Sequence, residues 1–143
     1  MTIIVRPATP EDAAAVASLS EELGHPVPAS DVPSRLSRVR GDGGAVILAV
    51  DVERPVALMC LARLDVMHAS GPVAYITALV ITEDSRGRGL GRTLVHEAIR
   101  WARENGCERI SVTSAEYRAD AHAFYPRCGL PYTGRRFSAP ITQ

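Results

Sequence analysis

The sequence predicts a mixed α/β fold in which an antiparallel β-hairpin is followed by a strand–helix–strand unit. Two apolar runs, AVILAV and PVALMCLARL, are separated only by DVER, an interval typical of a hairpin. A third apolar run, VAYITALVI, leads through a glycine-rich turn into a helical pattern and then into the run ERISVTSA. The two strands of such a unit are expected to be parallel, so the sheet should be mixed but mostly antiparallel, with helices flanking it. At 143 residues, the chain 1–143 is expected to form a single domain.

The first part of the chain predicts one strand and two helices. The run TIIVRPA favours a strand, and TPEDAAAVASLSEEL favours a helix. Thr9 stands at the N-cap of that helix, Pro10 at its first position, and Asp12 completes a capping pattern. A weaker, arginine-rich helix is predicted over residues 30–40, and GDGG then interrupts the chain.

The remainder predicts a long helix, a strand, a short helix and a terminal strand. Apolar residues recur at helical spacing from Leu90 to Ala102, and Asn105 followed by Gly106 supplies the stop. The run RADAHAFYPRCG predicts a short helix, and YTGRRFSAPI predicts a terminal strand or hairpin. Because VAYITALVI is the most apolar of the strands, it is expected to be a central one.

The composition is that of an ordinary soluble globular protein. Its 16 basic residues, all arginine, balance 16 acidic residues, and 46% of the chain is hydrophobic. Neither a broad nucleic-acid-binding face nor a membrane span is expected. The N-terminal segment shows no signal-peptide pattern, so we expect a cytoplasmic protein. Three cysteines without a CxxC spacing support neither a disulfide framework nor a metal site.

A turn rich in glycine and arginine separates VAYITALVI from the long helix. A strand that ends in such a turn and leads directly into a helix aims unpaired N–H groups and the positive end of the helix dipole at one point. Glycines let a phosphate approach the backbone, and arginines can pair bidentately with its oxygens. We therefore predict a site for a pyrophosphate or a similar anion. Its residues, called here the anion-binding turn, are Arg86, Gly87, Arg88, Gly89, Leu90, Gly91 and Arg92.

Two familiar phosphate motifs are excluded at this turn. A P-loop requires a lysine, and the chain contains none. The dinucleotide fingerprint GxGxxG fails because its third glycine is replaced by Arg92 or Leu94, depending on the first glycine chosen. A solvated helix start with flexible glycines is the alternative that stays open.

The arrangement Arg86-x-x-Gly89-x-Gly91 after ALVITEDS, with AHAFYPRCGL further along, resembles the acetyl-CoA-binding core of the GCN5-related N-acetyltransferases (GNAT). The resemblance covers most of the chain and implies a single-domain GNAT fold. It implies acetyl-CoA as the acetyl donor, no metal, and direct attack of a primary amine through a tetrahedral intermediate. We expect the amine to belong to a small molecule, because a compact domain has little surface for docking a peptide.

The resemblance also assigns roles to particular residues. The amides of residues 87–92 would hold the CoA pyrophosphate, and the pantetheine arm would pair like an added strand with Leu79, Val80 and Ile81. Amides there would stabilise the oxyanion, a role that requires a backbone bulge. Tyr125 aligns with the tyrosine that protonates the departing thiolate, for which a phenol of pKa ~10 is a suitable donor.

Two departures from the family pattern stand near Tyr125. Pro126 follows it directly and is expected to end the helix early, and Arg118 replaces an asparagine that contacts the cofactor. The general base is also missing, because Thr77 and Thr113 occupy the positions where relatives often carry glutamate. The remaining candidates for a base are Glu83, Asp84, Glu116, His68 and His122. An amine of low pKa would need no base, since positioning alone supplies much of the rate.

Other functions and partners stay open. A non-catalytic acyl-CoA sensor, a protein N-acetyltransferase and a nucleotide-phosphate binder of another fold are the alternatives. The acceptor is expected near the first two helices and the loop DVMHASGP. The segment EELGHPVPASDVPSRL resembles one found in small bacterial acetyltransferases that are often dimeric, so a homodimer is a further expectation.

Overall fold

The computed structural model describes residues 2–113, 119–134 and 136–141. The chain divides into two compact units, residues 1–112 and 113–143, and each unit is described by itself. The expectation of a single domain over the whole chain stays a prediction. Within the described ranges, no helix is both long enough and apolar enough to cross a membrane.

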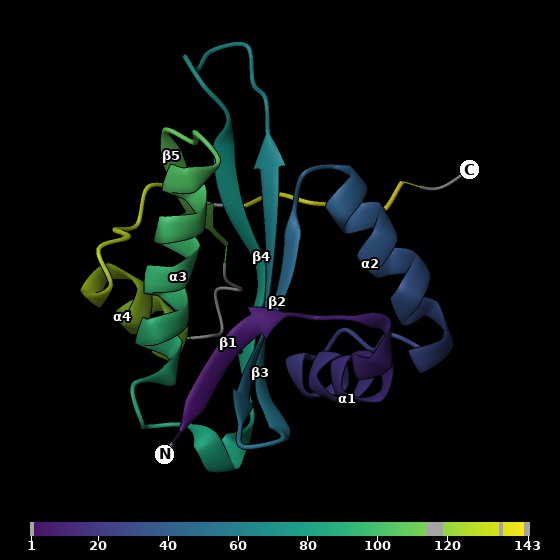
Figure 1. Cartoon of the computed structure of the whole chain (residues 1–143). Coiled ribbons are helices and arrows are strands. Elements are labelled where there is room, and N and C mark those ends of the chain that lie inside the picture. The colour runs from purple at the N-terminus through teal and green to yellow at the C-terminus, as the bar shows by residue number, and fades with distance from the viewer. Residues whose placement is uncertain (1, 114–118, 135, 142–143) are drawn as a thin grey trace. The chain divides into compact units, whose positions relative to one another are not determined.

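The first unit is built around a five-stranded sheet with the strand order β1-β2-β3-β4-β5 (Figure 1). Its strands are β1 (Ile3–Pro7), β2 (Ala45–Asp51), β3 (Arg54–Leu64), β4 (Val73–Ile81) and β5 (Arg109–Val112). Its helices are α1 (Ala13–Leu23), α2 (Val32–Gly41) and α3 (Leu90–Glu104), with short 3₁₀ turns η1 (Pro10–Asp12), η2 (Ala29–Asp31) and η3 (Glu83–Ser85). Neighbouring strands are antiparallel except β4 and β5, which are parallel. The predicted fold class, a mixed and mostly antiparallel sheet flanked by helices, is confirmed.

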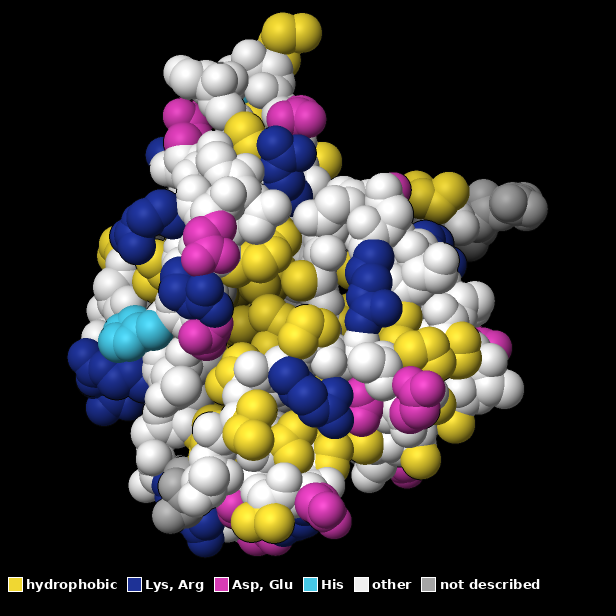
Figure 2. Space-filling model, in the orientation of Figure 1, with side chains coloured by type: hydrophobic (Ala, Val, Ile, Leu, Met, Phe, Trp, Pro, Cys, Tyr) yellow, Lys and Arg dark blue, Asp and Glu magenta, His cyan; other side chains and the backbone are white. Residues whose placement is uncertain are grey.

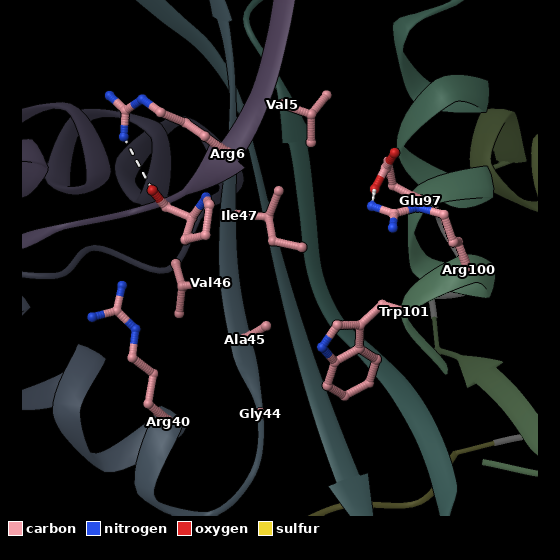
Figure 3. Close-up of a pocket in the computed structure, with 11 residues that line it drawn as sticks. Val5, Arg6, Arg40, Gly44, Ala45, Val46, Ile47, Glu97, Arg100 and Trp101 are labelled. Carbon is pink, nitrogen blue, oxygen red and sulfur yellow. Dashed lines mark hydrogen bonds and ion pairs between the residues drawn. The ribbon is translucent and has the colours of Figure 1, made fainter. Parts of the chain in front are cut away.

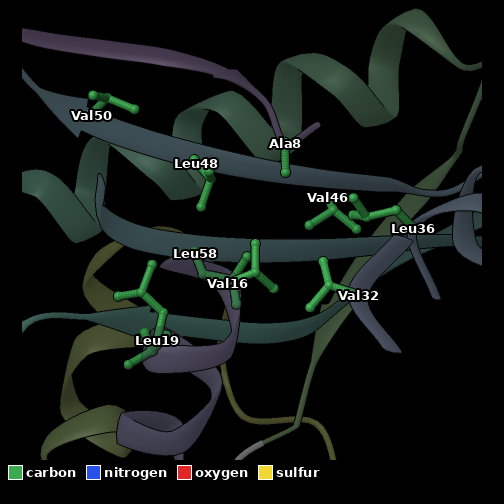
Figure 4. Close-up of a cluster of buried hydrophobic side chains, with 10 residues drawn as sticks. Ala8, Val16, Leu19, Val32, Leu36, Val46, Leu48, Val50 and Leu58 are labelled. Atoms are coloured by element: carbon green, nitrogen blue, oxygen red, sulfur yellow. The ribbon is translucent and has the colours of Figure 1, made fainter. Parts of the chain in front are cut away.

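The two faces of the sheet are covered by different helices. Helices α1 and α2 lie on one face and α3 lies on the other (Figure 1). On the first face, Leu48 and Leu58 from neighbouring strands pack in one cluster with Val16 of α1 and Val32 of α2 (Figure 4). Strand side chains alternate between the two faces, so β2 and β3 contribute to both clusters. The sheet is therefore the middle layer of a three-layer unit.

Helix α3 buries one side against the sheet, as its apolar spacing predicts. Leu94 and Ala98 are fully buried, and they share a cluster with Ile47, Met59 and Ile76 of the strands. These helical positions are four residues apart and lie on one face of the helix. Because rotation of α3 would expose this face to water, the packing also fixes where the first turn of the helix lies.

The second unit contains helix α4 (Ala119–Arg127), which runs through Pro126 instead of ending before it. The expected early end of this helix is therefore wrong. A proline costs most in a helix interior, where it removes a hydrogen bond and clashes with the preceding turn, and Pro126 stands in the last turn. The end of α4 is secured by Gly129 at φ +91°, with Leu130 N–H donating to Tyr125 O at 3.0 Å and Gly129 N–H to Pro126 O at 3.1 Å.

The terminal strand expected over YTGRRFSAPI is also wrong for the residues that the structure describes. Residues 132–134 and 136–141 carry no strand. Phe137 is 90% exposed and Ile141 is 94% exposed, so neither packs as a strand residue would. Pro140 lacks the N–H that a ladder needs. Apolar and aromatic residues alone do not make a strand without a partner strand to bond.

An ion pair joins the end of β1 to the start of the first helical segment. The carboxylate of Asp12 accepts hydrogen bonds from the two terminal nitrogens of Arg6 at 2.8 and 2.9 Å, and from the Thr9 N–H at 2.8 Å. Thr9 and Asp12 thus form the predicted capping arrangement at turn η1. The hydrogen bonds from Arg6 are the main cause that lowers the pKa of Asp12 to about 2.

This shift predicts a specific loss of stability in acid. A carboxyl whose pKa is depressed in the folded state stabilises the protein above its unfolded pKa, and this stabilisation disappears as the pH falls through the folded value. We expect the free energy of unfolding to decrease by about 1 to 2 kcal/mol between about pH 4 and pH 2 on account of Asp12. Urea denaturation over this pH range should show the full decrease for the parent and for Asp42→Asn, at the exposed end of α2, and a decrease smaller by this amount for Asp12→Asn, which keeps the other carboxyls of lowered pKa. An equal acid dependence in Asp12→Asn would contradict the assignment.

Candidate active site

Strand β4 carries a bulge at Thr77. Along the β3–β4 ladder, Cys60 opposes Ala78 and Leu61 opposes Ile76, so Thr77 is an extra residue without an opposite partner. Its hydroxyl donates a hydrogen bond to the carbonyl of Cys60 at 3.2 Å, and its side chain is exposed. A bulge in this strand is the feature that the expected oxyanion role requires.

Beyond the bulge, one edge of β4 is open. Strand β5 pairs with β4 only over Val73–Ile76, so among the described residues no strand pairs with the outer edge of β4 after Ile76. The N–H of Thr82 donates to Val56 O at 2.8 Å and therefore points toward β3. Because backbone groups alternate along a strand, those of Leu79 and Ile81 point the other way, toward the open edge.

Arg86 ties the anion-binding turn to this edge. Its Nε donates a hydrogen bond to the carbonyl of Ile81 at 3.1 Å, which agrees with the direction inferred for that carbonyl. Between the two residues, η3 makes a compact turn in which Ser85 is only 3% exposed and its N–H donates to Thr82 O. The open edge of β4 thus leads directly into the anion-binding turn.

The glycines of the turn adopt conformations that other residues avoid. Gly87 has φ +80° and Gly89 has φ +77°, both in the left-handed region. A Cβ placed on either residue would meet no heavy atom within 4 Å. The requirement for glycine is therefore one of backbone conformation, and the space outside these two residues is open to a ligand.

Helix α3 begins inside the turn and presents unpaired donors there. Gly89 is its N-cap, and the ladder starts with the Thr93 N–H donating to Gly89 O at 3.1 Å. The N–H groups of Leu90, Gly91 and Arg92 precede that bond and have no partner within the helix. The helix dipole and the exposed side chain of Arg92 add positive charge beside these N–H groups, an arrangement that favours an anion such as a phosphate.

The other residues expected at the site have defined positions in their own units. Val80 packs in the cluster under α1 and α2, whereas the side chains of Leu79 and Ile81 pack on the α3 side. Tyr125 is half-buried in α4, and its ring meets that of Phe124 edge-on with 5.2 Å between centroids. Tyr125 belongs to the second unit, so its role at the cofactor site stays a prediction.

Asp84 is a poor candidate for the general base. Its carboxylate forms an ion pair with Arg54 at 2.9 Å, and hydrogen bonding from Arg54 is the main cause that lowers its pKa. A carboxylate held by a guanidinium accepts a further proton less readily. The expected role of Asp84 is therefore to join η3 to Arg54 at the start of β3. We do not expect its carboxylate to take a proton from an amine.

The remaining candidates for a base are dispersed. Glu83 is exposed in η3, and His68 is exposed in the loop before β4, at the end of that strand away from the turn. His122 is exposed in α4 of the second unit, while Glu116 and Arg118 lie outside the described residues. None of these roles is tested by the geometry, so each stays a prediction.

The thiol of Cys60 lies next to the bulge but is not a nucleophile at neutral pH. Burial raises its pKa to about 11, so it carries no charge there. Within residues 2–113, 119–134 and 136–141, no group of three or more His, Cys, Asp or Glu side chains could hold a metal ion.

Comparison with known proteins identifies a family. A family model described as the acetyltransferase (GNAT) family matches residues 13–130. Among curated proteins, the chain is 30% identical over 97 residues to the uncharacterized N-acetyltransferase YhdJ of Bacillus subtilis (strain 168). That alignment covers 67% of this chain and 68% of the relative.

Solved structures share the fold over nearly the whole chain. The structure of a putative acetyltransferase from Agrobacterium tumefaciens str. C58 superposes with a TM-score of 0.81 at 26% sequence identity. The match covers 98% of this chain and 99% of the Agrobacterium chain. An aminoglycoside N-acetyltransferase in complex with CoA has a TM-score of 0.85 at 15% identity and covers 98% of this chain and 95% of its own. At 15% identity the likeness shows the fold alone.

The conformation of Gly89 predicts a stability difference between two matched substitutions. In Gly89→Ala, the new methyl group meets open space but the residue must keep φ near +77°, which should lower the free energy of unfolding by about 1 to 2 kcal/mol. In Gly41→Ala, in the last turn of α2, the methyl group also meets open space and φ is not positive. This control should be neutral or slightly stabilising. Denaturant titration of both variants measures the difference, and equal effects would contradict it.

Proposed function

This chain belongs to the acetyltransferase (GNAT) family, and on that premise we propose that it transfers the acetyl group of acetyl-CoA to a primary amine of a small molecule. The observation that carries the proposal is the continuity between the open edge of β4 and the anion-binding turn. An acetyl donor that carries a pyrophosphate and an extended arm with amide groups matches this arrangement, because the arm can pair with the open edge of β4 while the pyrophosphate binds at the turn. Acetyl-CoA supplies an acetyl group activated as a thioester.

The donor would be held mainly by backbone groups of this chain. The N–H groups at the start of α3 bind the pyrophosphate, and Arg92 adds charge beside them. The backbone groups of Leu79 and the N–H of Ile81 pair with the amides of the pantetheine arm, as an added strand would, while the carbonyl of Ile81 already accepts a hydrogen bond from Arg86. The bulge at Thr77 leaves backbone groups out of the β3–β4 ladder, and an unpaired N–H there would stabilise negative charge on the thioester oxygen.

The proposed chemistry requires one proton donor from the chain. The amine nitrogen forms a bond to the acetyl carbon, and the resulting tetrahedral intermediate carries its negative charge on the former thioester oxygen. The intermediate then collapses as the carbon–sulfur bond breaks, and the electron pair of that bond leaves with sulfur. Tyr125 donates its phenolic proton to the departing thiolate. The amine loses one proton to solvent, directly or through a base, and the phenolate regains one, so the overall charge is unchanged.

A small molecule is proposed as the acceptor because a compact domain has little surface for docking a peptide. The aminoglycoside N-acetyltransferase that shares this fold is named for a small-molecule substrate. A protein N-acetyltransferase is the alternative within the same chemistry. The expected cytoplasmic location and a homodimer stay predictions.

A non-catalytic acyl-CoA sensor is the second candidate, and a specific observation favours it. The bulge of β4 carries Thr77 where relatives often carry glutamate, and its hydroxyl is engaged with the carbonyl of Cys60. A side chain that already donates its proton to a carbonyl, and has no basic group, cannot deprotonate an amine. Binding of acetyl-CoA without turnover of any amine would support this second candidate.

The donor site is tested by reversing one charge in the turn. We expect Arg92→Glu to weaken binding of acetyl-CoA at least about tenfold in a calorimetric titration, because a carboxylate would face the pyrophosphate. The fold should persist, since a glutamate in the first turn of a helix interacts favourably with the helix dipole. The matched control is Arg103→Glu in the last turn of the same helix, which changes the net charge equally and should leave the affinity unchanged. Equal loss in both variants, or none in Arg92→Glu, would contradict the site.

The role of Tyr125 is tested by removing one oxygen atom. We expect Tyr125→Phe to lower kcat by about 100-fold or more, since a positioned general acid contributes on this scale, while the Kd for acetyl-CoA changes little. Tyr132→Phe is the matched control in the same unit, because Tyr132 is 73% exposed. Thiol release with a panel of small amines measures both. Unchanged turnover in Tyr125→Phe would remove this residue from the mechanism without affecting the donor site.

A further inference from the structure

A cavity of about 310 Å³ lies in the first unit, near the edge of the sheet opposite to β5 (Figure 3). It opens where β1 stops covering β2, because the β1–β2 ladder ends with Pro7 opposite Ile47. Residues of β1 and β2 line it together with Arg40 of α2 and Trp101 of α3. We call it the β1–β2 cavity. The strand order separates it from the open edge of β4, so the proposed donor site does not use it.

The cavity combines apolar surface with a charged border. Val5, Ala45 and Ile47 line it, and the indole of Trp101 reaches toward Ala45 from α3 (Figure 3). In the space-filling view, an apolar hollow on this face is bordered by both arginine and acidic side chains (Figure 2). A volume near 300 Å³ is at the lower end for small-molecule sites, which are mostly apolar with a few polar groups that orient the ligand.

Two of the three arginines that line the cavity are neutralised within the chain. Arg6 forms its paired hydrogen bonds with Asp12 at 2.8 and 2.9 Å. Arg100 lies between Glu97 at 2.5 Å and Glu104 at 2.8 Å. The Glu97 carboxylate that also lines the cavity is thereby committed to a guanidinium, so it does not attract a cation strongly.

Arg40 differs from the other two. Its terminal nitrogen donates a hydrogen bond to the carbonyl of Ala8, which anchors the side chain. In the described part of the chain, no carboxylate forms an ion pair with Arg40. A guanidinium that is held in place, keeps further N–H donors and lacks a counter-charge is preorganised for an anion.

We propose that the β1–β2 cavity binds a small planar organic anion of the aromatic carboxylate class. The carboxylate pairs with Arg40, and the ring rests on the apolar lining beside Trp101. A planar ring suits this place because it can contact the indole by stacking or edge-on and is small enough for the volume. This cavity is distinct from the proposed donor site. The proposal for it therefore does not depend on whether the chain catalyses the proposed acetyl transfer.

The test uses the only tryptophan of the chain as its reporter. Because Trp101 lines the cavity, its fluorescence should change when a ligand enters. The probes are benzoate, benzamide and benzylamine, which share one ring and differ in charge. We expect a saturable change with benzoate, binding at least about tenfold weaker with benzamide, and no saturable change with benzylamine.

Variants then locate the site. Arg40→Gln should lower the affinity for benzoate at least about tenfold. Arg38→Gln removes the same charge from an exposed position on α2 and should leave the affinity for benzoate unchanged. Since Arg40→Gln also loses the bond to Ala8, Ala45→Leu provides a second variant that fills the cavity and leaves Arg40 in place. Ala45→Leu should abolish the change in Trp101 fluorescence that benzoate causes in the parent. Thermal unfolding verifies that each variant is folded.

Several results would overturn the proposal. These are equal affinity for benzamide, tighter binding of benzylamine, no saturable change with benzoate, or benzoate binding that survives Ala45→Leu. A sedimentation experiment in which the protein is a dimer that excludes benzoate would also overturn it, because the cavity would then belong to an interface between copies.

Discussion

The proposed active site depends on one change along strand β4. From Val73 to Ile76 this strand has a neighbour on each side, and from Thr77 onward the structure describes a neighbour on one side only. The bulge at Thr77 marks the place of the change. A strand that stayed paired along its whole length would have no backbone groups to offer a ligand, and a strand unpaired along its whole length would be an ordinary sheet edge. The half-paired strand is anchored and still available for binding.

The two helical layers keep that edge in register with the anion-binding turn. Val80 is packed from the α1 and α2 side, and Ile81 from the α3 side, so β4 cannot slide without disturbing both clusters. Helix α3 is fixed by its buried face, and its first turn therefore has a fixed place after the strand. Arg86 then bonds the carbonyl of Ile81 and joins the two elements. The packing and this hydrogen bond thus hold the free N–H groups at the start of α3 next to the open edge of β4.

The sequence predicts the parts of this arrangement that depend on local chemistry. The capping residues at turn η1, the hairpin of β2 and β3, the parallel β4–β5 pair and the buried face of α3 all follow from spacing and are found as expected. The bulge could not be predicted, because it arises from the register between two strands and Thr77 is an ordinary strand residue. The prediction of a strand over YTGRRFSAPI is wrong for a related reason, because a strand forms only where a partner strand is available for hydrogen bonding. The β1–β2 cavity had no signal in the sequence, because its walls come from four separate elements.

The absence of lysine gives the electrostatics of the chain a simple form. A guanidinium stays protonated at every pH at which the protein is folded, so the charge that the anion-binding turn offers to a phosphate is constant. The backbone N–H groups of the turn do not titrate either. A pH dependence of acetyl transfer near neutrality would then come from groups outside this turn, such as the acceptor amine, a general base or a phosphate of the cofactor. The same argument applies to Arg40, where a change in carboxylate binding with pH would report the ligand and not the guanidinium. In both sites the positive charge contributed by arginine is therefore constant, and any pH dependence of binding reports the ligand.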